Sequence, residues 1–190
     1  MSITMTSRML YALHQVVAIV NDDDTLARAM VQISILHYEQ GSNVDVAYDM
    51  ACKAYQIFAQ QNSDHNLLFN ILYMMASIRM DQGRLDEAWN LYVQYVETTQ
   101  QTYEERDLHV ALTKHAKGKI CMLRGDLKTA IGFLQDSSND FQSLGLAADD
   151  DNVISAFCDQ ARCWEMLGDH SSSRLLQMKC WLVLCPGIEI

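Results

Sequence analysis

A glycine recurs at an almost constant interval along this chain. Gly41, Gly83, Gly125 and Gly168 are separated by 42, 42 and 43 residues. A fixed period of this length is typical of stacked structural repeats, because each unit buries its apolar face only against its neighbours. The glycine period therefore predicts an array of similar units.

Small residues flank these glycines at fixed distances. Seven residues earlier stand Ser34, Ala76, Gly118 and Ala161; five residues later stand Ala88, Ala130 and Ser173, while Ala47 follows Gly41 by six. Small side chains at both distances allow two antiparallel helices to approach closely. Each glycine is thus expected to mark the turn of a helix–turn–helix unit.

Apolar residues at helical spacing extend this pattern over the whole chain. Pro186 is the only proline, so long helices are permitted. The acidic runs at 21–25 and 149–152 are expected to cap the helices that follow them, since carboxylates accept hydrogen bonds from free helix amides. The expected helices span 4–19, 24–40, 45–61, 65–82, 85–101, 104–124, 127–143, 151–167 and 170–184.

The unit around Gly83 resembles the tetratricopeptide repeat (TPR) in Ala76, Gly83, Ala88 and Tyr92. That repeat has about 34 residues, so the longer period here is similar to an extended variant found in bacterial regulators and sensors and in some vesicle-trafficking adaptors. The resemblance implies an all-α, right-handed α-α superhelix, a TPR-like solenoid with an N-terminal helix and four helix–turn–helix repeats. It implies a single domain over 1–190, with a capping helix at 1–20 and repeats at 24–61, 64–102, 104–145 and 150–187.

In this family the first helix of each pair lines a concave groove, chiefly through its fifth, ninth and twelfth positions. Carried onto this sequence, with position one taken fourteen residues before each glycine, these positions predict a site that binds a peptide or helix of a partner protein. The predicted partner-binding residues are Val31, Ile35, Tyr38, Tyr73, Ser77, Met80, His115, Lys119, Met122 and Arg162. The groove would be apolar at one end and basic at the other.

The basic end stands out because the chain is acidic overall, with 14 basic and 24 acidic residues and a formal charge of −10. Residues 108–125 contain three lysines and one arginine but no acid. His115 and Lys119 share a helix face, and with Arg162 they are predicted to hold carboxylates of an acidic or C-terminal segment. The alternative is a solvated helix face that compensates acidic neighbours. Ile35 stands where chaperone-binding relatives have a clamp asparagine, so heat-shock chaperone tails are not expected.

Charge and composition also argue against several classes of function. A net charge of −10 repels nucleic acid and anionic lipid. The sequence lacks both a run of about 20 apolar residues and a credible secretory cleavage site, so a cytoplasmic protein is expected.

The cysteines and histidines do not form a recognisable metal motif. Cys158 and Cys163 are five apart, as are Cys180 and Cys185, and a step of five rotates by about 140° on a helix. The thiols of each pair diverge, so these cysteines, like Cys52 and Cys121, are interpreted as free thiols of the core rather than zinc ligands. We find no zinc, calcium, phosphate-loop, dinucleotide or nucleophile-elbow pattern. No metal, cofactor or catalytic residue is expected.

A non-enzymatic adaptor is the preferred functional hypothesis. The alternatives are a partner- or ligand-gated regulator of transcription or secretion, and a cytoplasmic chaperone of an exported protein; an enzyme ranks after these. The degenerate last repeat is expected to expose Trp181, Leu182, Val183 and Leu184. A homodimer through this C-terminal repeat is a further hypothesis.

Overall fold

The computed structural model describes residues 5–41, 43–61, 65–100 and 106–184. In these ranges the regular structure consists of nine helices and no strand. They are α1 (Met5–Ile19), α2 (Asp23–Glu39), α3 (Val44–Gln61), α4 (His65–Asp81), α5 (Leu85–Gln100), α6 (Arg106–Leu123), α7 (Leu127–Ser143), α8 (Asp151–Met166) and α9 (His170–Leu184). The predicted helices are confirmed to within two residues at each end.

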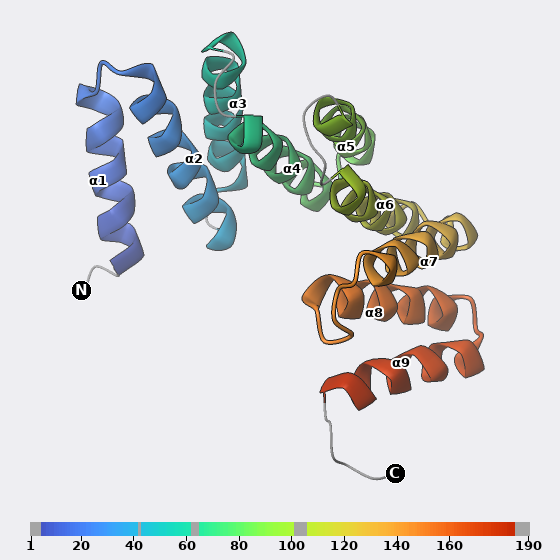
Figure 1. Cartoon of the computed structure of the whole chain (residues 1–190). Helices are drawn as coiled ribbons and strands as arrows, with labels where there is room; N and C mark the ends of the chain where they lie inside the picture. The colour runs from blue at the N-terminus through green and yellow to red at the C-terminus, as the bar shows by residue number, and fades with distance from the viewer. Residues whose placement is uncertain (1–4, 42, 62–64, 101–105, 185–190) are drawn as a thin grey trace. The chain divides into compact units, whose positions relative to one another are not determined.

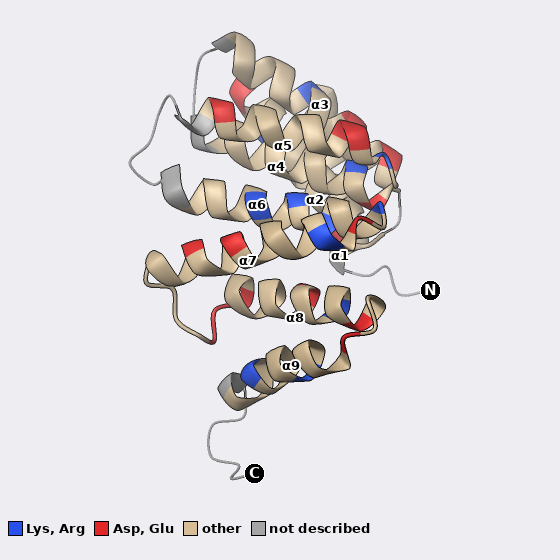
Figure 2. Ribbon diagram, turned by 90° about the vertical axis from the view of Figure 1, so that its right-hand side faces the viewer, with Lys and Arg blue, Asp and Glu red and all other residues tan. Residues whose placement is uncertain are grey.

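The chain divides into two compact units, which are described separately. Unit 1 comprises residues 1–95, with α1 to α4 and most of α5; unit 2 comprises residues 96–190, with the end of α5 and α6 to α9. Within unit 2, helices α6, α7, α8 and α9 follow one another as a stack (Figures 1 and 2). The single domain predicted over 1–190, with its repeat boundaries, stays a prediction.

The periodic glycines end the first helix of each pair. Gly83 has a φ of +73°, a left-handed conformation that L side chains rarely adopt. Its amide donates to the Met80 carbonyl at 3.0 Å, and the Arg84 amide donates to the Arg79 carbonyl at 2.9 Å. These two bonds satisfy carbonyls that the helix end leaves open. Positive φ angles recur at Gly41, Gly125 and Gly168, so the sequence period is a period of turns.

The small residues that were predicted at the helix crossings are all buried. The Ser34 hydroxyl donates to the Ala47 carbonyl at 2.6 Å, which ties α2 to α3. Gly118 faces α7 so closely that an added Cβ would lie 2.6 Å from Cγ of Leu134. Close contact between paired helices therefore depends on small side chains at these positions.

Each unit has its own apolar core. In unit 1, Phe58, Ile71 and Met75 are buried between α3 and α4 and pack with residues of α2. In unit 2, Phe141 and Val153 belong to a cluster that joins α6, α7 and α8. None of the described helices combines the length and apolar character needed to cross a membrane.

Aspartates cap four of the described helices. Asp22 accepts from the Thr25 amide at 2.9 Å and Asp150 from the Asn152 amide at 2.8 Å, as predicted from the two acidic runs. Asp126 and Asp169 do the same for α7 and α9. Hydrogen bonds from side chains and backbone lower the pKa values of Asp22, Asp126 and Asp169, because they stabilise the ionised carboxylate.

The strongest of these effects predicts how α9 responds to acid. Hydrogen bonds from Ser171 and Ser172 lower the pKa of Asp169 to about 2. A folded pKa below the unfolded value means that the cap stabilises α9 fully above about pH 4 and is lost as the pH falls towards 2. Carbon-13 NMR of the side-chain carboxyls should give Asp169 a midpoint near 2. Replacing both Ser171 and Ser172 by alanine should move the titration midpoint of Asp169 towards 3.8. The control variant Ser143→Ala, in α7, should leave this midpoint unchanged.

Candidate functional site

The predicted partner-binding residues are divided between the two units. Six lie on α2 and α4 of unit 1, and four lie on α6 and α8 of unit 2. Each group is described within its own unit, and a groove that unites the two groups stays a prediction.

Three of the predicted residues offer little surface. Val31 belongs to the core of unit 1 and is 6% exposed, while Met80 and Met122 are 7% and 8% exposed. Their side chains fill space between helices, so few of their atoms are accessible to a partner. Ile35 is half-buried and packs against the same core as Val31.

Tyr38 connects α2 to the end of α4. Its hydroxyl donates to Oδ2 of Asp81 at 2.6 Å. Burial raises the pKa of Tyr38 far above its usual value, and the hydrogen bond to Asp81 is the second largest cause of this increase. The phenol therefore stays protonated as a donor, and its hydroxyl is already engaged within unit 1.

Tyr73 and Ser77 contact α5. The Tyr73 ring lies 5.5 Å from the Tyr92 ring and 5.6 Å from the Tyr95 ring, both in tilted or edge-on geometry. The Ser77 hydroxyl lies 3.0 Å from the Tyr92 hydroxyl and donates to the Tyr73 carbonyl at 3.0 Å. Burial raises the pKa of Tyr73. These contacts hold an aromatic cluster in fixed orientation between α4 and α5.

His115 forms a polar contact between α6 and α8. Its Nε2 lies 3.0 Å from Oδ2 of Asp159, and both side chains are almost completely buried. A buried imidazole that already faces a carboxylate is not available to a carboxylate of a partner. His115 is therefore better placed to fix the distance between α6 and α8 than to contact a ligand.

The two other predicted basic residues have a different environment. Among the described residues, neither Lys119 nor Arg162 has an ion-pair partner. Lys114, by contrast, pairs with Asp140 of α7 at 2.5 Å. Lys119 is half-buried on α6, four residues after His115, and Arg162 is exposed on α8, three residues after Asp159. Figure 2 shows basic residues on α6 and acidic residues on α7.

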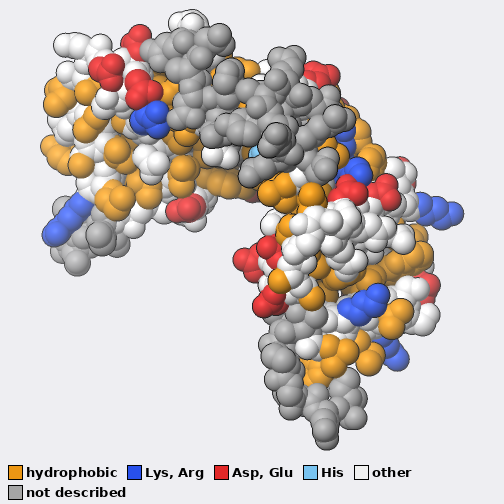
Figure 3. Space-filling model, in the orientation of Figure 1, with side chains coloured by type: hydrophobic (Ala, Val, Ile, Leu, Met, Phe, Trp, Pro, Cys, Tyr) orange, Lys and Arg blue, Asp and Glu red, His pale blue; other side chains and the backbone are white. Residues whose placement is uncertain are grey.

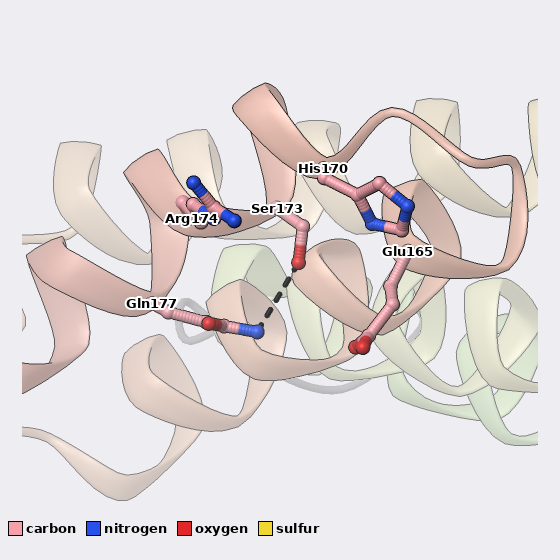
Figure 4. Close-up of a pocket in the computed structure, with 5 residues that line it drawn as sticks. All are labelled: Glu165, His170, Ser173, Arg174 and Gln177. Atoms are coloured by element: carbon pink, nitrogen blue, oxygen red, sulfur yellow. Dashed lines mark hydrogen bonds between the residues drawn. The ribbon is translucent and has the colours of Figure 1, made fainter.

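A small polar cavity lies beside the turn between α8 and α9 (Figure 4). It measures about 160 Å³ and is lined by Glu165, His170, Ser173, Arg174 and Gln177. Gln177 donates to the Ser173 hydroxyl at 3.2 Å. Ligand pockets usually enclose about 300 Å³ or more, so this cavity has room for a few water molecules rather than a substrate.

The thiols of the described residues are dispersed over several helices. No group of three or more histidine, cysteine, aspartate or glutamate residues in the described ranges is arranged to hold a metal ion. Cys121, Cys163 and Cys180 are buried, and burial raises the pKa of Cys163 to about 11. The interpretation as core cysteines is wrong for Cys158, which is exposed; its Sγ lies 3.8 Å from Sγ of Cys180, so it is at the edge of the contact between α8 and α9 rather than in the core. Cys185 lies outside the described residues.

The partners of the predicted residues were not found from the sequence. Asp81, Tyr92 and Asp159 contact Tyr38, Ser77 and His115, respectively. One signal was present for Asp159. His115 occupies the fifth position of its repeat, and Asp159 directly follows the fifth position of the next repeat. Tyr92 belongs to the residues that carry the repeat resemblance, but nothing in the sequence indicates its contact with Ser77, and no signal marks Asp81.

Comparison with known proteins identifies the fold. No family model matches the sequence, and no curated protein sequence matches it. BtubC (BKLC) from P. vanneervenii has a similar structure, with a TM-score of 0.70 and 16% identity over 97% of this chain and 74% of that chain. A kinesin light chain candidate of P. anserina with nearly identical TPR-like repeats is also similar. Its TM-score is 0.70, with 16% identity over 94% of this chain and 86% of that chain.

A Rap protein complexed with competence and sporulation factor is also similar. Its TM-score is 0.73, with 13% identity over 92% of this chain and 48% of that chain, so this chain spans about half of its length. At these identities the likeness establishes architecture alone. The predicted all-α, TPR-like fold is confirmed.

Proposed function

We propose that this chain is a non-enzymatic protein-interaction module that binds an acidic segment of a partner protein along α6 and α8. The observation that carries this proposal is the pair of cations Lys119 and Arg162, which have no ion-pair partner among the described residues of a chain with ten excess negative charges. Such a chain has many acids available, and Lys114 shows that α6 lysines do pair where an acid is near.

The arrangement of α6 and α8 supports this function. Lys119 and Arg162 each lie one helical turn beyond the His115–Asp159 contact, on helices that this contact holds together. Two cations on helices that contact each other can bind two carboxylates of one segment, or a side-chain carboxylate and a C-terminal carboxylate. Charge-assisted contacts of this kind select acidic partners more than they add affinity.

The structural neighbours are consistent with a binding role. The Rap protein was crystallised with competence and sporulation factor bound, which shows that one protein of this architecture receives a ligand. The same architecture supports many functions, so the assignment for this chain depends on Lys119 and Arg162.

Charge reversal tests the proposal. The probe is a short fluorescein-labelled peptide of alternating glutamate and alanine with a free C-terminus, titrated by fluorescence anisotropy. Lys119→Glu and Arg162→Glu should each weaken binding by about fivefold to tenfold, because each change replaces an attraction by a repulsion. Added salt should weaken binding of the unmodified protein, since exposed charges are screened.

Lys128→Glu is the matched control. Lys128 is exposed on α7, and its reversal changes the net charge by the same amount. Binding to Lys128→Glu should stay within about twofold of that of the unmodified protein. Equal losses in all three variants would mean that only net charge matters, and the proposed site would then be wrong. Equal affinity for a peptide with glutamine in place of glutamate would contradict it as well.

A ligand-gated regulator is the second candidate, favoured by the likeness to a Rap protein with a bound factor. In that case binding would change how the helices pack, rather than only occupy a surface. Hydrogen exchange distinguishes the two functions. A regulator should alter amide protection in helices away from α6 and α8, whereas a simple adaptor should alter it only in those two helices.

A further inference from the structure

The last described helix presents an apolar stripe to solvent. Leu175, Met178, Trp181 and Leu182 are 59%, 48%, 38% and 48% exposed. They are spaced by three, three and one residues and therefore lie along one side of α9. The opposite side is buried against α8 through Ser173 and Cys180. Among the exposed large apolar residues of the described chain, no other four lie on one face of one helix in this way.

A shallow cavity runs along this stripe. It has a volume of about 350 Å³ and is lined by Arg174, Gln177, Met178 and Trp181. Figure 3 shows hydrophobic side chains intermixed with basic ones over the region that α9 occupies. A cavity of this size accommodates one or two large side chains of a docked helix, as in helix-in-groove recognition.

The charged side chains of α9 itself are all positive, whereas Glu165 of α8 lines the neighbouring polar cavity together with Arg174. Residues 170–184 contain Arg174 and Lys179 but no acid, although the chain as a whole carries a charge of −10. Arg174 lines the cavity together with Met178 and Trp181, and Lys179 lies at the opposite edge of the stripe, with its Nζ 5.8 Å from the centre of the Phe157 ring. A partner helix whose apolar stripe is accompanied by acidic side chains would complement this arrangement of apolar and basic side chains on α9.

This charge pattern disfavours two other occupants. A second copy of α9 packed on the first would bring Arg174 and Lys179 against the same cations of its partner, and like charges repel. An anionic lipid surface would match the stripe but would have to approach a molecule with ten excess negative charges. An acidic helix avoids the first obstacle, and because it carries far fewer negative charges than a lipid surface, the net charge of the chain opposes it less.

We infer that the exposed face of α9, formed by Leu175, Met178, Trp181 and Leu182, is a docking surface for an acidic amphipathic helix of another protein. This surface is distinct from the one formed by Lys119 and Arg162, so the two proposals are independent of each other. Apolar residues of the docked helix lie in the cavity beside Met178 and Trp181, while its acids pair with Arg174 and Lys179.

The test uses the full chain and a designed helical peptide. The probe carries leucines at positions three and four apart, with glutamates on both sides of the leucine stripe. Two control peptides have lysines in place of the glutamates, or the same composition in scrambled order. Isothermal titration should show binding of the acidic peptide only. Met178→Gln and Lys179→Glu should each weaken it by about tenfold.

Matched variants keep this result specific. Met166→Gln alters a methionine on α8 that is also exposed, and Lys128→Glu makes the same charge change on α7. Both should bind the acidic peptide as the unmodified protein does, and so should Lys119→Glu, which separates this surface from that of the proposed function. A loss in Met166→Gln equal to that in Met178→Gln would overturn the inference.

Three further outcomes would also overturn it. Self-association that Met178→Gln abolishes, without peptide binding, would show that a second copy covers the stripe. Sedimentation with vesicles of phosphatidylcholine and phosphatidylserine, but no peptide binding, would show a lipid surface instead. Peptide binding that appears only after removal of residues 185–190 would show that the chain's own end occupies the stripe.

Discussion

Replacement of Gly118 by alanine is expected to lower the free energy of unfolding by about 1–3 kcal/mol. An added Cβ would lie 2.6 Å from Cγ and 2.8 Å from Cδ2 of Leu134, and 3.3 Å from the Ala130 carbonyl oxygen. Leu134 is completely buried and cannot move away without displacing its neighbours. The overlap therefore outweighs the gain of up to about 1 kcal/mol that alanine brings to a helix interior.

Gly132 provides the matched control for this substitution. It is also within a helix, but it is exposed, and an added Cβ would meet nothing within 4 Å. Gly132→Ala should therefore raise the free energy of unfolding by up to about 1 kcal/mol. The same chemical change is thus predicted to have opposite signs at two glycines of adjacent helices.

A double-mutant cycle attributes the Gly118 effect to its contact. Leu134→Ala alone should cost about 2–5 kcal/mol, but less in a chain that already carries Gly118→Ala, because the truncation also removes the overlap. Urea unfolding followed by circular dichroism measures all four species, and hydrogen exchange of α6 and α7 locates the effect. Additive costs, or a stabilising Gly118→Ala, would refute the close approach of α6 and α7.

Replacement of Asp159 by alanine is expected to cost about 1–3 kcal/mol, because it leaves the buried imidazole of His115 without its partner. Asp159→Asn keeps an acceptor oxygen and should cost less. Asp136→Ala, at an exposed position of α7, should stay within about 0.5 kcal/mol of the unmodified protein. The measurement is again urea unfolding.

The same variant also separates positioning from direct contact. If the His115–Asp159 contact holds α6 and α8 at the distance that a bound segment requires, Asp159→Asn should bind the glutamate–alanine peptide more tightly than Asp159→Ala does. If Asp159→Ala had the same free energy of unfolding as Asp136→Ala, the contact between His115 and Asp159 would not hold α6 and α8 together.

The fold could be predicted from the sequence because its main determinants are local. The left-handed turn at Gly83 and the close helix contact at Gly118 each require a particular small residue, so both are visible as letters at fixed spacing. The aspartate caps at Asp22 and Asp150 are likewise defined within a few residues. A repeated local requirement produces a period, and the period predicts the array.

The candidate site was less predictable because its contacts join distant parts of the sequence. The resemblance placed His115 on the inner face, but the 44 residues that separate it from Asp159 give no indication that the two side chains meet. Tyr38 and Asp81 are 43 residues apart. A repeat pattern does not encode such pairings. It therefore does not indicate which inner-face residues already have a partner and which, like Lys119 and Arg162, lack an ion-pair partner in the described chain.

The succession of helix contacts has a consequence for how fast each unit folds. In unit 1, α1 contacts α2, α2 contacts α3 and α3 contacts α4; in unit 2 the same holds from α6 to α9, and α6 also contacts α8. Contacts between chain neighbours close only short loops, and proteins rich in such contacts fold within microseconds to milliseconds. The contact between α6 and α8 includes His115 and Asp159, which are 44 residues apart, so it closes a longer loop than the contacts of α7 with α6 and α8 do. Helix pairing should therefore be rapid, and the registration of α6 with α8 should be the late step in unit 2.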